Sequence, residues 1–175
     1  MTRPCTVAVL GLLCLPAIAL AQAANPMSAA IRSQHDTIKG NLVKSAEQMS
    51  EADYAFKPTP EVRSFGELVG HVANANYAIC AMALGDKSPA AANIEKTVTG
   101  KAALAKALTD SVAFCDGAIA KLTAASALEE VKVFGTTQPR LAVFAFNNSH
   151  NMEHYGNMVT YMRMKGLVPP SSARP

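Results

Sequence analysis

Residues 101–122, KAALAKALTDSVAFCDGAIAKL, carry the clearest periodic pattern in this 175-residue sequence. Their large apolar side chains recur at steps of three or four residues: Leu104, Leu108, Val112, Cys115, Ile119 and Leu122. Apolar residues at this spacing form one stripe along an α-helix, and a helix buries such a stripe against the rest of the protein. The stretch therefore predicts an amphipathic helix that starts near Thr99.

Residues 28–49, at the start of the chain's periodic part, predict a second helix. One face of it carries residues at the same three- and four-residue steps: Ile31, His35, Ile38, Leu42, Ser45 and Met49. Ser28 precedes this face, and serine is a favoured N-cap because its hydroxyl accepts a hydrogen bond from the first turn. We therefore expect the helix to begin at Ser28.

Two more helices are marked by their ends. Ser64 and Glu67 have the spacing of a capping box, and Gly85 follows the last apolar residues, so residues 64–84 predict a helix. Pro139 suits a first helical turn, and Gly166 suits a stop, so residues 139–165 predict another.

The four predicted helices indicate an all-α fold, a four-helix bundle with long connections. The connections of about 13–16 residues exceed those of a simple up-and-down bundle, which makes a non-sequential packing order plausible. Residues 130–134 can form a short extended piece, but we expect too little chain there for a sheet.

The N-terminus predicts a secretory signal peptide. Arg3 is the only early charge, the run from Thr6 to Leu20 is apolar or small, and small residues at cleavage spacing follow it. A membrane anchor is the alternative, but 15 apolar residues fall below the roughly 20 that a spanning helix needs. We expect a signal peptide at residues 1–23, a bundle domain at 24–170, a disordered tail at 171–175, and an exported protein, periplasmic or secreted, without stable membrane insertion.

The charge of the mature chain excludes two classes of partner. Removal of residues 1–23 takes away Arg3 alone, which leaves 15 basic against 13 acidic residues. This balance is too weak, and the charges too scattered, for binding to nucleic acid or to an anionic membrane.

Two cysteines, Cys80 and Cys115, remain after processing. An even pair in an exported chain predicts a disulfide, with two buried free thiols as the alternative. Cys80 follows His71 by nine residues, about half a turn around the helix, so it is expected to face away from His71.

The histidines predict a metal site. His150 and His154, four residues apart on one helix, can chelate a metal together. His71, on another helix, can supply a third imidazole. Three neutral imidazoles suit zinc, nickel, copper or iron(II), and they leave an open coordination position. Asn147, Glu153 and Tyr155 are candidates for supporting these ligands, or they are surface residues.

Two longer motifs carry a family resemblance. Residues 54–71, YAFKPTPEVRSFGELVGH, and residues 150–170, HNMEHYGNMVTYMRMKGLVPP, resemble the DinB family's entry into its second helix and its final helix. The resemblance implies a DinB-type four-helix bundle that holds one divalent metal, zinc or nickel by preference, through His71, His150 and His154. Relatives are often dimeric, which leaves a homodimer open.

The resemblance also suggests an activity. Relatives include metal-dependent thiol transferases and isomerases, whereas a hydrolase fits an exported protein better; the substrate is an unknown small molecule. His35 and Glu67 are the candidate catalytic residues, although a core histidine bonded to backbone is the favoured interpretation of His35. The alternatives are a non-catalytic metal-binding module, or a bundle whose histidines are incidental. The patterns of di-iron, haem and phosphate-loop proteins are absent.

Overall fold

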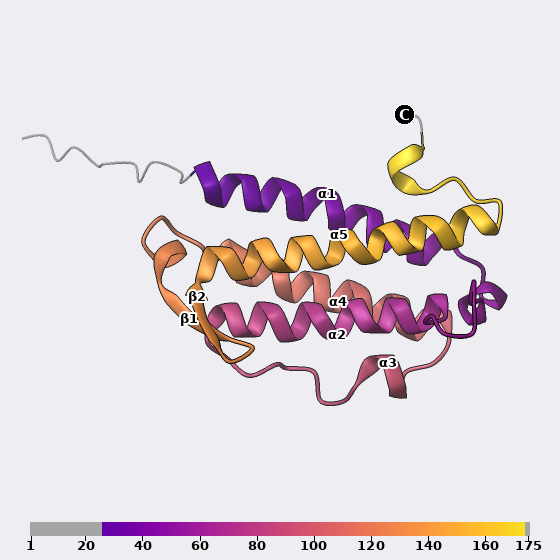
Figure 1. Cartoon of the computed structure of the whole chain (residues 1–175), viewed down its shortest axis with the longest axis horizontal. Coiled ribbons are helices and arrows are strands. Elements are labelled where there is room, and N and C mark those ends of the chain that lie inside the picture. Colours follow the sequence, from indigo (N-terminus) through magenta and orange to yellow (C-terminus); the bar gives the residue numbers. More distant parts are fainter. Residues whose placement is uncertain (1–25, 174–175) are drawn as a thin grey trace, which may run out of the picture.

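Five α-helices and one β-hairpin make up residues 26–173, the part of the chain that this computed structural model describes (Figure 1). The elements are α1 (Pro26–Gln48), α2 (Phe65–Leu84), α3 (Ile94–Thr97), α4 (Lys101–Ala120), β1 (Glu130–Val133), β2 (Thr136–Pro139) and α5 (Arg140–Met164). Short 3-10 helices lie at Ala52–Ala55, Ser126–Leu128 and Pro170–Ser172. The predicted signal peptide lies outside the described residues.

The four long helices form a bundle whose packing order differs from the chain order. α1 packs against α5 and α4, and α2 packs against α4 and α5, so α1 and α2 lie diagonally opposite each other (Figure 1). The long connections allow this, because the segment between α2 and α4 runs back along the length of the bundle past α3, so that α4 starts beside the start of α2 (Figure 1). The all-α bundle with long connections and non-sequential packing is confirmed.

The helix starts are partly as predicted. α2 begins with the expected capping box, because the Ser64 hydroxyl accepts from the Glu67 backbone and the Glu67 carboxylate accepts from the Ser64 backbone. The prediction that Ser28 caps α1 is wrong. The helix begins at Pro26, whose fixed φ suits a first turn, and Ser28 is buried inside the helix.

The capping box gives a direct test of this helix start. Replacing Ser64→Ala removes the acceptor that lies 3.1 Å from the Glu67 backbone nitrogen. We expect a loss of about 1 kcal/mol in the free energy of unfolding, measured by urea denaturation. Ser64→Thr keeps a hydroxyl and should lose less; an equal loss in both variants would contradict the assignment.

The segment before α5 is a hairpin, which corrects the expectation that too little chain is available for a sheet. β1 and β2 pair antiparallel, with Val133 opposite Thr136. The two turn residues, Phe134 and Gly135, both have positive φ angles, 47° and 80°. A two-residue turn of this kind matches the twist of paired strands, so ten residues suffice.

The core consists of two apolar clusters with a polar layer between them. One cluster centres on Phe65, Leu108 and Met158, and the other on Phe144 and the cysteines. Between them, at mid-height of the bundle, lie buried polar side chains from all four long helices: His35, Asn76, Ser111, Asn147, Asn148 and Asn151. The candidate histidines lie at the edge of this layer.

The cysteines join α2 to α4, as the sequence predicted. Cys80 and Cys115 form a disulfide with their Cα atoms 5.5 Å apart, and both side chains are buried. Since α2 turns Cys80 into the core, the cysteines are kept away from the histidines on its other face.

Residues 171–173 are ordered, unlike the disordered tail expected at 171–175, of which residues 174 and 175 lie outside the described residues. Within Pro170–Ser172 the Tyr155 hydroxyl donates to the Ser171 hydroxyl at 2.7 Å and accepts from the Ser171 backbone at 2.9 Å. These bonds hold the segment against α5.

No helix within residues 26–173 is long and apolar enough to span a membrane.

Candidate metal centre

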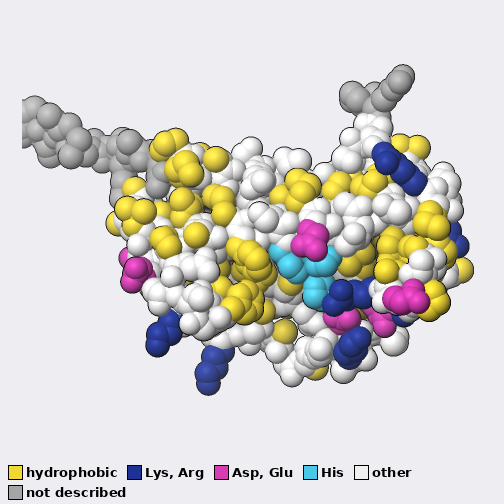
Figure 2. All heavy atoms as spheres, viewed as in Figure 1, with side chains coloured by type: hydrophobic (Ala, Val, Ile, Leu, Met, Phe, Trp, Pro, Cys, Tyr) yellow, Lys and Arg dark blue, Asp and Glu magenta, His cyan; other side chains and the backbone are white. Residues whose placement is uncertain are grey.

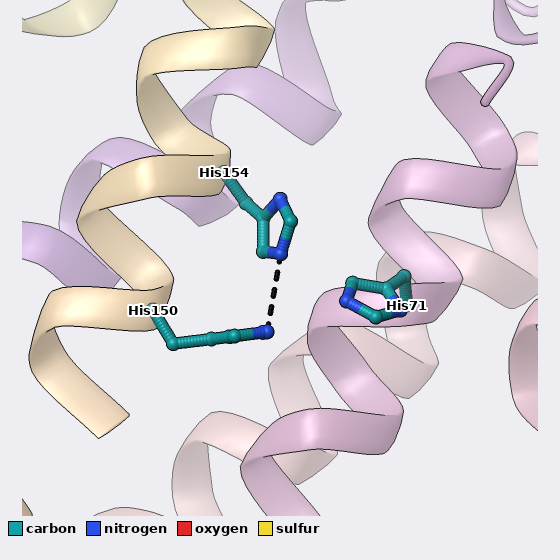
Figure 3. A group of neighbouring side chains, drawn as sticks. All are labelled: His71, His150 and His154. Carbon is teal, nitrogen blue, oxygen red and sulfur yellow. Dashed lines mark hydrogen bonds between the residues drawn. The ribbon is translucent and has the colours of Figure 1, made fainter. Parts of the chain in front are cut away.

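Three histidines meet at the surface of the bundle. His71 comes from α2, and His150 and His154 come from successive turns of α5, which packs beside α2. One ring nitrogen from each lies within 4.8 Å of the others. Figure 3 shows the three imidazoles pointing toward a common centre from the two helices. The sequence-predicted ligand residues are therefore brought together.

The ring nitrogens are arranged as a metal would require. The Nε2 atoms of His150 and His154 are 3.1 Å apart, close to the roughly 3.3 Å that two nitrogens about 2.0–2.1 Å from a tetrahedral ion would show. The Nδ1 of His71 faces a carboxylate oxygen of Glu95 at 3.1 Å, so its Nε2 is left for the centre. Three imidazoles with converging nitrogens fit a divalent transition metal.

The two α5 histidines are held in the neutral form that binds metal. Burial lowers the pKa of His154 to about 4, helped by the adjacent His150 and His71. Burial and the neighbouring His71 also lower the pKa of His150. Both rings are therefore deprotonated at neutral pH, and their nitrogen lone pairs are available without the release of a proton.

Glu95, from α3, supports the site and was not found by sequence reasoning. Its Oε2 accepts from His71 Nδ1, and its Oε1 accepts from Arg63 Nε at 3.0 Å. Burial raises the pKa of Glu95, but the hydrogen bonds from Arg63, His71 and Lys96 outweigh burial and lower it. An ionised carboxylate behind a histidine fixes its tautomer and makes the free nitrogen a better ligand.

Gly70 is what lets Glu95 reach the site. A Cβ atom added at Gly70 would lie 2.8 Å from the Glu95 Cα and 3.1 Å from its backbone nitrogen. Side chains at this position are therefore excluded by the backbone of α3. The close approach of α3 to α2 places the Glu95 carboxylate one residue further along α2, at His71.

The centre is open to solvent and borders a pocket. His71 and His150 are partly exposed, and Figure 2 shows the histidines at the molecular surface with charged side chains beside them. A pocket of about 730 Å³ adjoins them, and Glu95 and Asn157, which contact His71 and His154, are in its wall. Within residues 26–173 no fourth histidine, cysteine or carboxylate joins the three converging nitrogens.

The sequence of this chain matches one family over most of its length. The profile of the DinB superfamily matches residues 34–158, which include all three histidines. The chain belongs to the DinB superfamily. No curated protein matches it.

Two solved structures of DinB-like proteins share the fold. One, from Bacillus cereus ATCC 10987, superposes with a TM-score of 0.70 at 15% sequence identity. The matched region covers 81% of this chain and 95% of the Bacillus cereus chain. The other, from Bacillus subtilis, has a TM-score of 0.65 at 22% sequence identity. The matched region covers 79% of this chain and 93% of the Bacillus subtilis chain. The DinB helical fold is therefore shown for this chain.

Asn147, Glu153 and Tyr155 were candidates for supporting the metal ligands of this DinB superfamily member, but none of them forms a hydrogen bond to a ligand ring among the bonds within residues 26–173. Asn147 donates to Asn76 in the polar layer, Tyr155 bonds to Ser171, and Glu153 is exposed. Helical spacing put them within one turn of the histidines, and of the three only Glu153 acts on a ring, since its negative charge partly opposes the lowering of the His150 pKa. Glu95 and Asn157 contact those rings instead.

Neither candidate catalytic residue is among the three converging ligands: His35 lies in the polar layer, and Glu67 lines the adjoining pocket. His35 is buried in the polar layer, and its Nε2 lies 2.9 Å from Asp116 Oδ1 on α4, so the expected backbone partner is replaced by a carboxylate. Glu67 is held in the capping box and by an ion pair with Lys57. The backbone hydrogen bond from Ser64, followed by Lys57, lowers the pKa of Glu67 to about 2, which leaves it a poor base.

The role of Glu95 can be measured. Glu95→Gln keeps an oxygen near His71 but removes the negative charge, so we expect metal affinity to fall by about 10- to 100-fold. A zinc competition titration with a chromophoric chelator gives the affinity. Glu61→Gln, in the same pocket wall but away from the histidines, is the matched control. Equal affinities in wild type and Glu95→Gln would contradict this role.

Proposed function

We propose that this protein is an exported, metal-dependent enzyme of the hydrolase or thiol-transferase type that acts on a small molecule. The observation that carries the proposal is the open histidine triad beside a pocket. A structural metal site is normally closed by a fourth protein ligand, whereas a catalytic site keeps a position free. His71, His150 and His154 would hold one divalent ion, with zinc or nickel favoured.

A bound divalent ion would supply a Lewis acid that polarises a substrate bond or activates a nucleophile. The protein's own residues prepare the site for this chemistry. Glu95 orients His71 through Nδ1, and burial keeps His150 and His154 neutral. The adjoining pocket can exclude part of the solvent and hold the remainder of the substrate.

Export is supported by the disulfide. Cys80 and Cys115 are bonded within the core, and such bonds persist in oxidising compartments such as the periplasm. An outer compartment favours hydrolysis over transfer of a cytoplasmic thiol.

The test is turnover that depends on the histidines. Wild-type protein loaded with zinc or nickel would be assayed with 4-nitrophenyl esters, a 4-nitrophenyl phosphodiester, and a chlorodinitrobenzene thiol-transfer reaction. We expect a rate at least roughly 100-fold above that of the His150→Ala, His154→Ala variant in one class, since a metal contributes several kcal/mol of charge stabilisation. Stoichiometric metal without turnover in any class would favour the non-catalytic binding module.

A further inference from the structure

Phe134, at the tip of the β1–β2 hairpin, is both strained and exposed. Its φ of 47° lies in the left-handed region, where a bulky residue is an outlier and where hairpin turns prefer asparagine or glycine. The side chain remains 68% exposed, so burial does not account for the choice of residue. Backbone strain of this kind is kept mainly at functional sites, so a large exposed apolar ring in a strained conformation indicates a role in binding rather than in folding.

The ring of Phe134 is the first of a row that leads to the metal centre. Its centroid is 5.9 Å from that of Phe146, in an edge-to-face arrangement, and Phe146 is 6.3 Å from His150. Phe146 is itself 44% exposed. Figure 2 shows a hydrophobic patch directly beside the histidines, on the side of the hairpin. Phe134 and Phe146 together are called the aromatic edge below.

The opposite side of the centre is polar and carries both basic and acidic side chains. On α5, Phe146 precedes His150 by four residues, whereas Asn157 and Tyr161 follow His154 and line the 730 Å³ pocket. Since these residues recur at steps of three or four, they lie along one face of the helix. The histidines therefore separate the aromatic edge from the pocket.

Arg63 lines that pocket and has N–H donors that are not used within residues 26–173. A guanidinium carries five N–H donors. Among the described residues, the Arg63 side chain donates only from Nε, to Glu95. The side chain is 42% exposed. Its terminal amino groups remain available for a planar anion. Lys57 and Lys96 lie in the same wall, where they pair with Glu67 and Glu95.

We propose that the substrate is an organic anion with an aromatic group, which packs on Phe134 and Phe146 while its carboxylate or similar anion binds Arg63. This inference rests on the proposed function and names the substrate class of the same site. An amphiphilic ligand of this kind would lie across the three histidines, with its reactive bond next to them. A purely polar ligand would leave the aromatic edge uncovered.

The experiment measures binding by calorimetry with three probes: 4-phenylbutyrate, butyrate, which lacks the ring, and 4-phenylbutan-1-ol, which lacks the charge. We expect 4-phenylbutyrate to bind about tenfold more tightly than either. Phe146→Ala should abolish the preference for the aromatic probe over butyrate. Arg63→Gln should abolish the preference for 4-phenylbutyrate over 4-phenylbutan-1-ol. Met164→Ala, an exposed apolar residue near the other end of α5, should change neither.

Phe134→Asn is the decisive variant, because it separates binding from folding. Asparagine before Gly135 is favoured in this turn, so the melting temperature should rise or stay unchanged while aromatic selectivity falls about five- to tenfold. A residue with a merely structural role would lower the melting temperature instead. Unchanged selectivity in Phe134→Asn and Phe146→Ala would overturn the proposal.

Two outcomes separate this proposal from the proposed function. Aromatic selectivity that persists in EDTA-treated protein, with no turnover in the loaded form, would uphold the aromatic edge and reject the enzyme. Turnover without aromatic selectivity would uphold the enzyme and reject the aromatic edge as a binding site. If sedimentation shows a wild-type dimer that Phe134→Asn converts to a monomer, without any probe binding, a second copy of the chain covers this edge and the proposal fails.

Discussion

Wild-type protein is expected to bind one divalent metal ion per chain, and the His150→Ala, His154→Ala variant to bind none. His71 alone would remain, and a single imidazole from a partly exposed position cannot hold an ion against water and buffer. Elemental mass spectrometry of the purified proteins gives the stoichiometry. A chelator competition titration after reconstitution gives the affinity.

The matched control for this experiment is His35→Gln. The chain has four histidines, and His35 is the one outside the centre, bonded to Asp116. We expect this variant to keep the full metal content. Equal metal content in the double variant would show that other groups bind the ion. Loss of metal in His35→Gln alone would place the site elsewhere.

The second large effect is expected from Asn76→Ala, in the polar layer. The Asn76 Oδ1 accepts from Asn151 Nδ2 at 2.8 Å and from Asn147 Nδ2 at 3.3 Å, and its Nδ2 donates to Ser111 Oγ. Asn76, Ser111 and Asn147 are fully buried. Alanine would leave their partners without bonds, and each such buried group costs about 1–3 kcal/mol.

We therefore expect Asn76→Ala to lower the free energy of unfolding by about 3–5 kcal/mol, measured by urea denaturation with an unchanged slope. Asn41→Ala is the control, since Asn41 is a half-buried asparagine inside α1 that lies outside the polar layer. Its change should stay within about 0.5 kcal/mol. A small effect in Asn76→Ala would mean that water replaces the lost amide.

The sequence was most informative where the determinants are local. The apolar stripe of residues 101–122 and the Ser64–Glu67 capping box predicted α4 and the start of α2, because helical period and capping depend on neighbours along the chain. The three histidines were also found, from spacing on a helix and from the resemblance, and the Cys80–Cys115 disulfide from the even pair of cysteines in a chain expected to be exported.

What the sequence missed depends on contacts between distant segments. Glu95 lies in a connection with no periodic pattern, and only the approach of α3 to Gly70 brings it to His71. The hairpin required Phe134 to adopt a positive φ, which its residue type disfavours. The buried asparagines of α5 gave no signal, because an inward polar residue is recognised only once its partners are known.

The contact between Gly70 and α3 also shapes how the chain can vary. Gly117 and Gly156 are exposed inside helices with nothing near their missing Cβ atoms, so alanine should be tolerated there and even improve the helix. At position 70 any side chain would push α3 outward and carry the Glu95 carboxylate away from His71. A mutational scan that selects for metal-dependent function should therefore find position 70 nearly invariant, although its residue touches neither metal nor substrate.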